Sequence, residues 1–149
     1  MKVVLDTNLL ASGFVNFAHP TTLSSAILQA WRAELFELVV SEFILAELER
    51  TLQKPYFRAR MSEQDQLAAL ALLRKFATLT AISIEVSGAA TQAKDDPIIA
   101  TAALCRTDFL VTDDRTFRDK VGPRFRNLAV VSLPEFTRVL GETGRSGQP

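Results

Sequence analysis

The sequence contains one cysteine and one histidine, and this scarcity limits the chemistry it can carry. Cys105 has no second cysteine with which to form an internal disulfide, so a reducing cytoplasm is the expected location. Cys105 stands in an apolar series and is expected to be a small buried hydrophobic residue. A zinc site of histidine and cysteine is not expected either, because His19 has no such partner near it in the sequence.

Long apolar runs are also missing. No run approaches the roughly 20 residues of a membrane span, and Asp6 and Asn8 interrupt the apolar stretch that a signal peptide would need. The net charge is zero, from 17 basic and 17 acidic residues, so a nucleic-acid-binding surface would have to be local, with acids gathered elsewhere. With 149 residues, 48% of them hydrophobic, the chain can bury the core of one compact domain.

Short apolar runs alternate with stretches of helical pattern along the chain. Strands are expected at residues 3–5, 35–40, 79–84, 109–112 and 128–131, and the first is followed by an Asp/Asn turn and a loop at 14–20. Helices are expected at residues 22–31, 42–52, 62–76, 96–104, 115–121 and from 132 to about 140. The helix at 62–76 is expected to bury Leu67, Leu70, Leu73 and Phe76 on one face.

Strands that alternate with helices form βαβ units, with parallel strands and helices on both faces of the sheet. We therefore expect an α/β fold, a three-layer α/β/α sandwich around a central parallel sheet of about five strands. Residues 1–140 are expected to form a single domain. Residues 141–149 are polar and rich in glycine and are expected to be a disordered tail.

Acidic residues recur where predicted strands end and predicted helices begin. They are Asp6 after the first strand, Glu47 in the helix after the second, Asp95 and Asp96 at a helix start, and Asp113 and Asp114 after the fourth strand. The carboxyl ends of parallel strands lie on one edge of a sheet, so these acids can converge there. Clustered carboxylates repel unless a cation joins them, and oxygen ligands suit Mg²⁺ or Mn²⁺. Such a site would catalyse phosphoryl transfer, including phosphodiester hydrolysis.

Each acid also has an ordinary structural explanation. An isolated glutamate such as Glu47 is usually a solvent-facing helix residue. Asp95 and Asp96 could do no more than cap a helix, and the pair at 113–114 could form a turn. Four independent coincidences at one sheet edge are less expected than one site.

Four motifs in this order resemble the PIN domain family. They are residues 6–8 (DTN), 41–48 (SEFILAEL), 95–102 (DDPIIATA) and 110–114 (LVTDD). Each motif is weak alone, but the four in order are fairly specific and together span most of the chain. The resemblance implies a metal-dependent ribonuclease that uses Mg²⁺ or Mn²⁺, commonly the toxin of a bacterial toxin–antitoxin pair.

Carried over position by position, the resemblance implies a catalytic and metal-binding set of four acids, namely Asp6, Glu47, Asp96 and Asp114. Asp96 is preferred to Asp95 because the family's acid precedes the following helix by this interval. Asp114 is preferred to Asp113 because the family often has a non-acidic residue after the Val-Thr pair, although both positions are acidic here.

Other residues are implied to support this set. Thr7 or Asn8 would hold Asp6 in place, and the remaining supporting residues are Thr112, Asp95 and Asp113. Two stretches are basic: residues 54–60 have three cations and no acid, and residues 115–126 have five cations and one acid. The second stretch begins beside the acidic edge, so Arg115 and Arg118 are expected to contact RNA phosphates. A solvated surface is the favoured interpretation of the first.

The resemblance also implies partners besides RNA. A small cognate antitoxin would cover the acidic edge, often with a basic side chain among the carboxylates, and homodimers are common among such proteins. The helices at 22–31 and 62–76 could offer a face to such a partner, whereas no contact with a membrane is expected.

Two other functions stay open. A haloacid-dehalogenase-like phosphatase also has an aspartate after its first strand, but it needs a second one two residues later, where this chain has Asn8. A PIN-like scaffold without activity would bind RNA or protein only, although all four acids are present here. Cleavage of RNA, turnover of a phosphomonoester, or neither would separate the three functions.

Overall fold

The computed structural model describes residues 1–80, 96–104 and 106–146, with only the backbone described at 96, 97, 103, 104 and 143–146. The elements in chain order are β1 (Lys2–Leu5), α1 (Thr7–Val15), α2 (Leu23–Arg32), β2 (Glu37–Ser41), α3 (Glu42–Leu52), α4 (Pro55–Arg58), α5 (Glu63–Phe76), β3 (Thr78–Thr80), α6 (Asp96–Leu104), β4 (Phe109–Val111), α7 (Arg115–Val121), β5 (Arg124–Phe125), β6 (Leu128–Val131) and α8 (Leu133–Ser146).

A six-stranded sheet in the order β3-β2-β1-β4-β6-β5 forms the centre of the molecule. All neighbouring strands are parallel except β5, which pairs antiparallel with β6. The central strand β1 aligns Val3 with Leu38 of β2 and Val4 with Leu110 of β4. These four residues are fully buried, as expected for parallel strands covered on both faces. The predicted α/β fold is confirmed, and the short strand β5 is added to the expected five.

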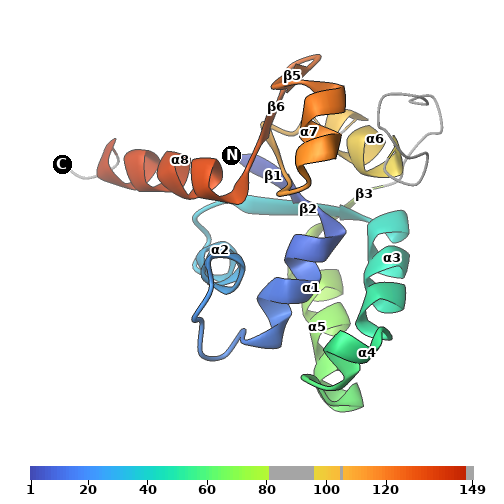
Figure 1. Ribbon diagram of the computed structural model, residues 1–149. Coiled ribbons are helices and arrows are strands. Elements are labelled where there is room, and N and C mark those ends of the chain that lie inside the picture. Colours follow the sequence, from blue (N-terminus) through green and yellow to red (C-terminus); the bar gives the residue numbers. More distant parts are fainter. Residues whose placement is uncertain (81–95, 105, 147–149) are drawn as a thin grey trace.

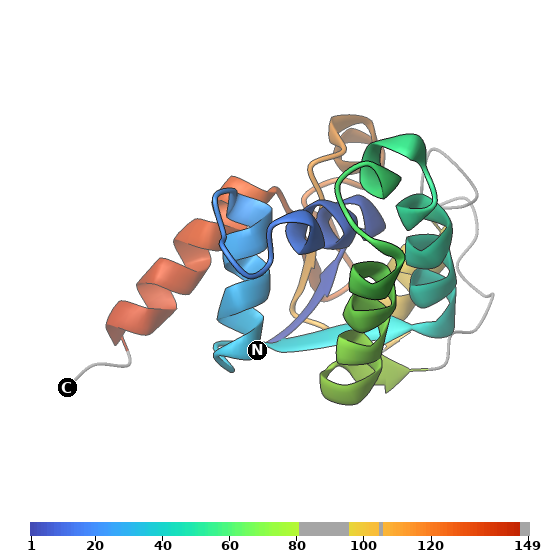
Figure 2. The same ribbon diagram turned by 90° about the horizontal axis from the view of Figure 1, so that it is seen from below.

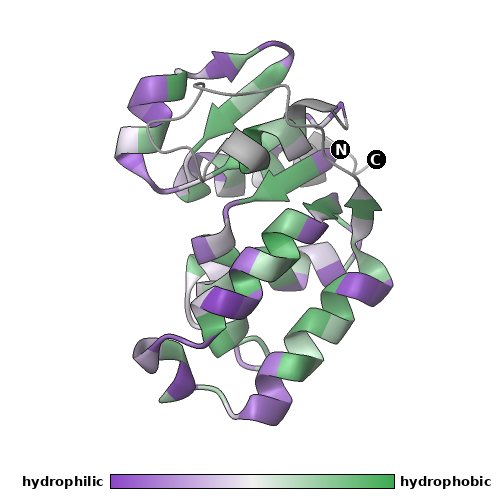
Figure 3. Ribbon diagram, turned by 90° about the vertical axis from the view of Figure 1, so that its right-hand side faces the viewer, coloured by the Kyte–Doolittle hydropathy of each residue, from purple (hydrophilic) through white to green (hydrophobic). Residues whose placement is uncertain are grey.

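Helices cover both faces of the sheet. Helices α1, α2, α3 and α5 lie on one side and α6 and α7 on the other (Figures 1 and 2). The hydropathy colouring shows strands that are largely hydrophobic and helices that carry both hydrophilic and hydrophobic residues (Figure 3). Helix α8 is anchored by the fully buried Phe136, whose ring centroid lies 5.3 Å from that of Phe36 and 5.6 Å from that of Phe109. In the described part of the chain, no helix is long and apolar enough to cross a membrane.

Helix α1 covers residues 7–15, where the sequence analysis expected an Asp/Asn turn and the first residues of a loop, so the turn is wrong. Residues 16–20 lie outside helices and strands, as the loop expected at 14–20 predicts. The helix lies between α2 and α3, and its buried residues point in several directions, which removes the amphipathic period that would have predicted it. Gly13 permits the close approach to α2, because a Cβ there would lie 2.6 Å from Leu28 Cδ1. The Ser25 hydroxyl donates to the Gly13 carbonyl at 3.0 Å across the same contact.

The predicted buried face of α5 is also wrong in part. Leu73 is fully buried, but Leu67 is 60% exposed and Phe76 is 44% exposed. The helix buries Gln66 instead, because its amide donates to the Leu52 carbonyl at 2.8 Å and its polar group is therefore satisfied.

Differences also occur toward the C-terminus. Helix α8 continues to Ser146, past the expected end near residue 140 and through part of the segment expected to be disordered. Strand β3 covers only Thr78–Thr80, and the rest of the strand predicted at 79–84 lies outside the described residues, as do Asp95 and Cys105.

Candidate active site

Three neighbouring strands bring polar residues to the carboxyl edge of the sheet. Strand β1 lies between β2 and β4, and its end is followed by Asp6. Strand β4 is followed by Thr112 and the two aspartates at 113–114, and β2 ends in Ser41. The Asp6 N–H donates to the Val111 carbonyl at 2.9 Å, which fixes the end of β1 against β4.

The Asp6 carboxylate is held by both of its oxygens. Oδ1 accepts the Asn8 backbone N–H at 3.2 Å and thereby caps helix α1. Oδ2 accepts the hydroxyl of Thr112 at 2.7 Å, a side chain that is itself buried. The carboxylate therefore has a fixed orientation at the sheet edge.

The same Thr112 hydroxyl connects Asp6 to Asp114. Its oxygen accepts the Asp114 backbone N–H at 3.1 Å while its proton is donated to Asp6. Asp114 Oδ1 in turn accepts the Phe117 N–H at 3.0 Å and caps helix α7. One hydroxyl group thus bonds the carboxylate that follows β1 and the backbone of the aspartate that follows β4.

The two carboxylates influence each other electrostatically. Burial raises the pKa of Asp6, and the negative charge of Asp114 raises it further, against the hydrogen bonds from Thr112 and the backbone of Asn8 and Thr7, which lower it. In the described part of the chain no ion pair offsets the Asp6 charge. Two close anions without a counter-charge favour the binding of a cation.

The surroundings of Asp113 differ from those of Asp114. Its Oδ1 accepts the Leu133 N–H at 2.9 Å at the start of α8 and lies 3.9 Å from Arg118 Nη1. The Asp6 pKa responds to the charge of Asp114, and Asp113 is not among its causes. The Thr112 hydroxyl, which bonds Asp6, also bonds the backbone of Asp114, whereas Asp113 is bonded to the start of α8.

Helix α6 also begins at this edge. It leads into β4, which is parallel to β1, so its first residue, Asp96, lies at the carboxyl edge of the sheet. Thr101, fully buried, donates its hydroxyl to Ser41 Oγ at 3.0 Å and ties the helix to the end of β2. The backbone thus places Asp96 at the edge, while its side chain lies outside the described atoms.

Glu47 is bound elsewhere. On α3 its carboxylate pairs with Arg50, one turn later, and its side chain is 28% exposed. Across the residues whose side chains are described, no three Asp, Glu, His or Cys groups gather closely enough to hold a metal ion. The structure therefore brings Asp6 and Asp114 together, but it does not place Glu47 with them.

The comparison with protein families agrees with this arrangement. A model of the PIN domain matches residues 2–116, which run from β1 into α7 and include all four motifs. The chain belongs to the PIN domain family. PIN domains are nucleases that typically use divalent metal ions. No curated protein in the comparison matches the chain.

The donor atoms at this PIN domain's sheet edge fit a hard divalent cation. They are carboxylate and hydroxyl oxygens, which Mg²⁺ and Mn²⁺ prefer. The Thr7 hydroxyl oxygen, next to Asp6, is buried without a hydrogen-bond partner among the described residues. Thr7 and Asn8 hold Asp6 through their backbone, not through the side chains that the sequence analysis considered.

The two arginines after Asp114 differ in their surroundings. Arg115 is exposed at the first position of α7. Arg118 is partly buried and donates from Nη1 to the Thr112 carbonyl at 3.0 Å, so it supports the loop that carries the acids. Sequence reasoning missed this support and the Thr101–Ser41 bond, although Thr101 is the one polar residue between 97 and 104.

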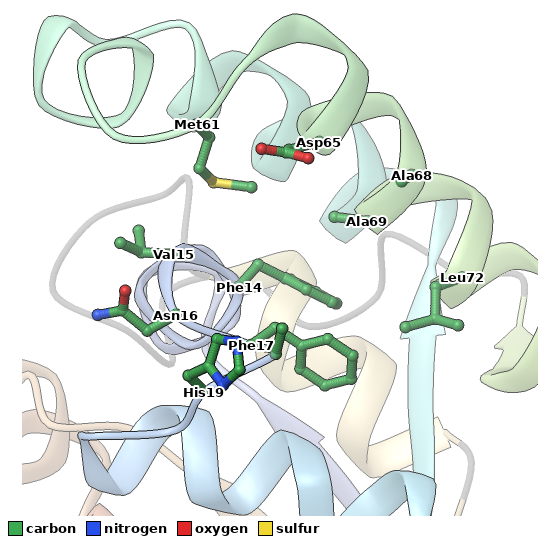
Figure 4. Close-up of a pocket in the computed structure, with 11 residues that line it drawn as sticks. Phe14, Val15, Asn16, Phe17, His19, Met61, Asp65, Ala68, Ala69 and Leu72 are labelled. Atoms are coloured by element: carbon green, nitrogen blue, oxygen red, sulfur yellow. The ribbon is translucent and has the colours of Figure 1, made fainter.

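An apolar hollow of about 410 Å³ lies apart from the acids. The end of α1 and residues 16–19 form one wall, and the start of α5 forms the other (Figure 4). Phe14 and Phe17 contact each other inside it, with ring centroids 5.4 Å apart. Met61 and Asp65 face them from the α5 side (Figure 4).

Proposed function

We propose that this PIN domain is a metal-dependent ribonuclease that hydrolyses RNA phosphodiester bonds at the carboxyl edge of its sheet. The observation that carries the proposal is the pair of Asp6 and Asp114, which one buried threonine hydroxyl holds together without a described counter-charge. Each carboxylate caps a helix as well, but a cap does not require a second anion beside it.

Asp6, Asp96 and Asp114 are proposed to hold the Mg²⁺ or Mn²⁺ ion, with Glu47 as a fourth acid. When bound, such an ion polarises a phosphate and lowers the pKa of a coordinated water molecule. Glu47 would have to exchange its partner Arg50 for the site, because the pair is exposed enough for a modest interaction energy.

The other residues of the edge would position the acids and the RNA. Thr112 holds Asp6 and Asp114, and Arg118 holds the carbonyl of Thr112. Arg115 is exposed beside Asp114 and is proposed to contact an RNA phosphate, because guanidinium groups bind phosphate oxygens in pairs of hydrogen bonds.

We further propose that the protein is the toxin of a toxin–antitoxin pair in the cytoplasm. An active ribonuclease in its own cell needs an inhibitor, and the two unneutralised acids would accept a basic side chain from an antitoxin. The hollow between α1 and α5 would suit an apolar segment of the same partner. We also propose a homodimer, and equilibrium sedimentation that yields monomer alone would contradict it.

The function is tested with purified protein, single-stranded RNA and either Mg²⁺ or Mn²⁺. We expect metal-dependent cleavage that EDTA stops and that Asp6→Asn abolishes, with the fold checked by circular dichroism. Turnover of a phosphomonoester without RNA cleavage would favour the phosphatase alternative. Binding of RNA without cleavage would favour a scaffold, and either result would contradict the proposal.

A further inference from the structure

A polar cavity of about 440 Å³ lies at the opposite, amino edge of the sheet. It is formed by the residues that lead into β4 and by the β5–β6 hairpin, which lies at the top of Figure 1. Its lining residues are Arg106, Thr107, Asp108, Phe125, Arg126, Asn127 and Leu128. None of them belongs to the proposed nuclease site.

Both arginines of this cavity occupy left-handed backbone positions. Arg106 has φ 51° two positions after the last residue of α6, and the Thr107 N–H donates to the Ala102 carbonyl of that helix at 3.2 Å. Arg126 has φ 57° as the first of the two residues that connect β5 to β6. Glycine or asparagine is the relaxed choice at both kinds of position. The chain thus carries a strained arginine twice around one cavity.

Neither guanidinium has an ion-pair or hydrogen-bond partner among the described residues. Arg126 lies 5.4 Å from the ring centroid of Phe125, which leaves its donors available. The one acid of the cavity, Asp108, already accepts the Lys2 backbone N–H at 2.8 Å through Oδ2. The cavity therefore has an excess of positive charge and of unused donors.

Thr107 adds an independent observation. The residue is only 4% exposed, and its hydroxyl oxygen is buried without a hydrogen-bond partner in the described part of the chain. Buried hydroxyl groups are ordinarily satisfied, and this one, beneath the surface of the cavity, is not satisfied by any described residue. The two guanidinium groups are the donors that can bind a phosphate through charge-assisted hydrogen bonds.

We propose that this cavity binds a phosphate group between Arg106 and Arg126. The phosphate can belong to a small phosphoester or to an RNA strand, which share the chemistry that the donors recognise. The proposal does not depend on nuclease activity, because the cavity lies at the other end of the strands from the acids.

The test is an NMR titration of the ¹⁵N-labelled full chain in EDTA, which prevents metal-dependent cleavage. Inorganic phosphate, adenosine monophosphate and a short single-stranded RNA are added separately at constant ionic strength. We expect saturable shifts of the Thr107 and Asn127 amide signals with at least one of them. The double variant Arg106→Gly, Arg126→Gly should lose at least about tenfold in affinity, because it removes charge-assisted hydrogen bonds.

The glycine variant relieves the backbone strain and should stay folded. Two controls accompany it. Arg124→Ala removes a charge from the same hairpin but not from the cavity wall. Glu34→Gly relieves the backbone strain at Glu34, which has φ 63° and is the third non-glycine residue described in the left-handed region. Both controls should bind like the parent.

Saturation by phosphate or the nucleotide identifies a small phosphoester, and saturation by RNA alone identifies the strand; both support the proposal. Shifts that sodium chloride reproduces, equal binding by the double variant, or no saturable shift with any probe would overturn it.

Discussion

The two edges of the sheet differ in the sign of their charged residues and in the bonds that those residues make. At the carboxyl edge, Asp6 and Asp114 each cap a helix, and the Thr112 hydroxyl bonds the Asp6 carboxylate and the Asp114 backbone N–H. At the amino edge, Arg106 and Arg126 are exposed, unpaired among the described residues and held in left-handed backbone. A chain of zero net charge thus carries a local acidic pair at one edge and a local pair of arginines at the other. Composition alone does not reveal such local sites.

The edges also differ in how well a purely structural explanation accounts for them. At the carboxyl edge each described aspartate caps a helix or accepts a helix N–H, so capping alone could explain its presence. At the amino edge the two arginines make no ion pair or hydrogen bond with the described residues, and Arg126 contacts only the ring of Phe125. Asparagine caps a helix about as well as aspartate, so an Asp→Asn change separates capping from charge.

The largest expected effect compares Asp114→Asn with Asp113→Asn. Asp114→Asn keeps the cap on Phe117 N–H but removes the charge beside Asp6, so RNA cleavage should fall at least about 100-fold. Asp113→Asn keeps an acceptor for the Leu133 N–H and should lose little of the RNA-cleavage rate. Steady-state cleavage rates at saturating Mg²⁺ measure both. The opposite ranking would show that the wrong neighbour has been assigned.

A smaller effect is expected at Thr112. Thr112→Val keeps the shape but removes the hydroxyl that links Asp6 to the Asp114 N–H, so cleavage should fall about 10–100-fold. Stability should fall by about 1 kcal/mol in urea unfolding, because a buried hydrogen bond is lost. Thr112→Ser should restore most of the activity. If valine changes stability but not the rate, the hydroxyl serves folding alone.

The arginines after Asp114 should show a more modest difference. Arg115→Ala should weaken RNA binding for all sequences alike and lower the slope of log K against log salt by about 0.7, the value for one single-strand phosphate contact. Arg118→Ala should additionally destabilise the protein, since its guanidinium holds the Thr112 carbonyl. Fluorescence anisotropy at several salt concentrations measures the slope. An unchanged slope in both variants would make this helix a solvated surface only.

The smallest expected effect is the pH dependence of stability in metal-free buffer. The raised pKa of Asp6 means that the folded protein holds this proton more tightly than the unfolded chain does. Ionised Asp6 therefore opposes folding above the folded-state pKa and has no such effect below the pKa of an unfolded aspartate. Asp6→Asn should melt about 2–5 °C above the parent at neutral pH.

This advantage should disappear below about pH 4, where Asp6 is protonated in both states. Thermal melts across this range, followed by circular dichroism, measure it. A parent that is as stable as the variant at neutral pH would mean that the carboxylate already has a favourable partner.

The sequence predicted most of the fold because its strands are short apolar runs and its helix starts carry recognisable caps. Ser41 and Thr22 cap the helices α3 and α2. Helix α1 was not predicted because both of its sides are covered by other elements. The buried face of α5 was predicted wrongly because it includes Gln66, whose amide is hydrogen-bonded to a backbone carbonyl. Such tertiary contacts leave no periodic signal along the chain.

The candidate site was predictable in part. Strand order alone brings the ends of β1 and β4 together, so the sequence could place Asp6 near Asp113 and Asp114. The choice between Asp113 and Asp114 depends on their hydrogen bonds, since Asp114 accepts the Phe117 N–H and Asp113 accepts the Leu133 N–H. No local sequence pattern predicts these bonds. The arginine-lined cavity was not predictable, because its left-handed residues follow from a helix end and a hairpin that meet only in the folded chain.

The central claim is that the acids at the carboxyl edge bind a divalent metal ion. Electron paramagnetic resonance of added Mn²⁺ counts the bound ions directly, without any assumption about the RNA. We predict saturable binding to the parent and to Asp113→Asn, and at least about tenfold weaker binding to Asp6→Asn and Asp114→Asn. Absence of saturable binding to the parent, or equal binding by all four proteins, would contradict the account.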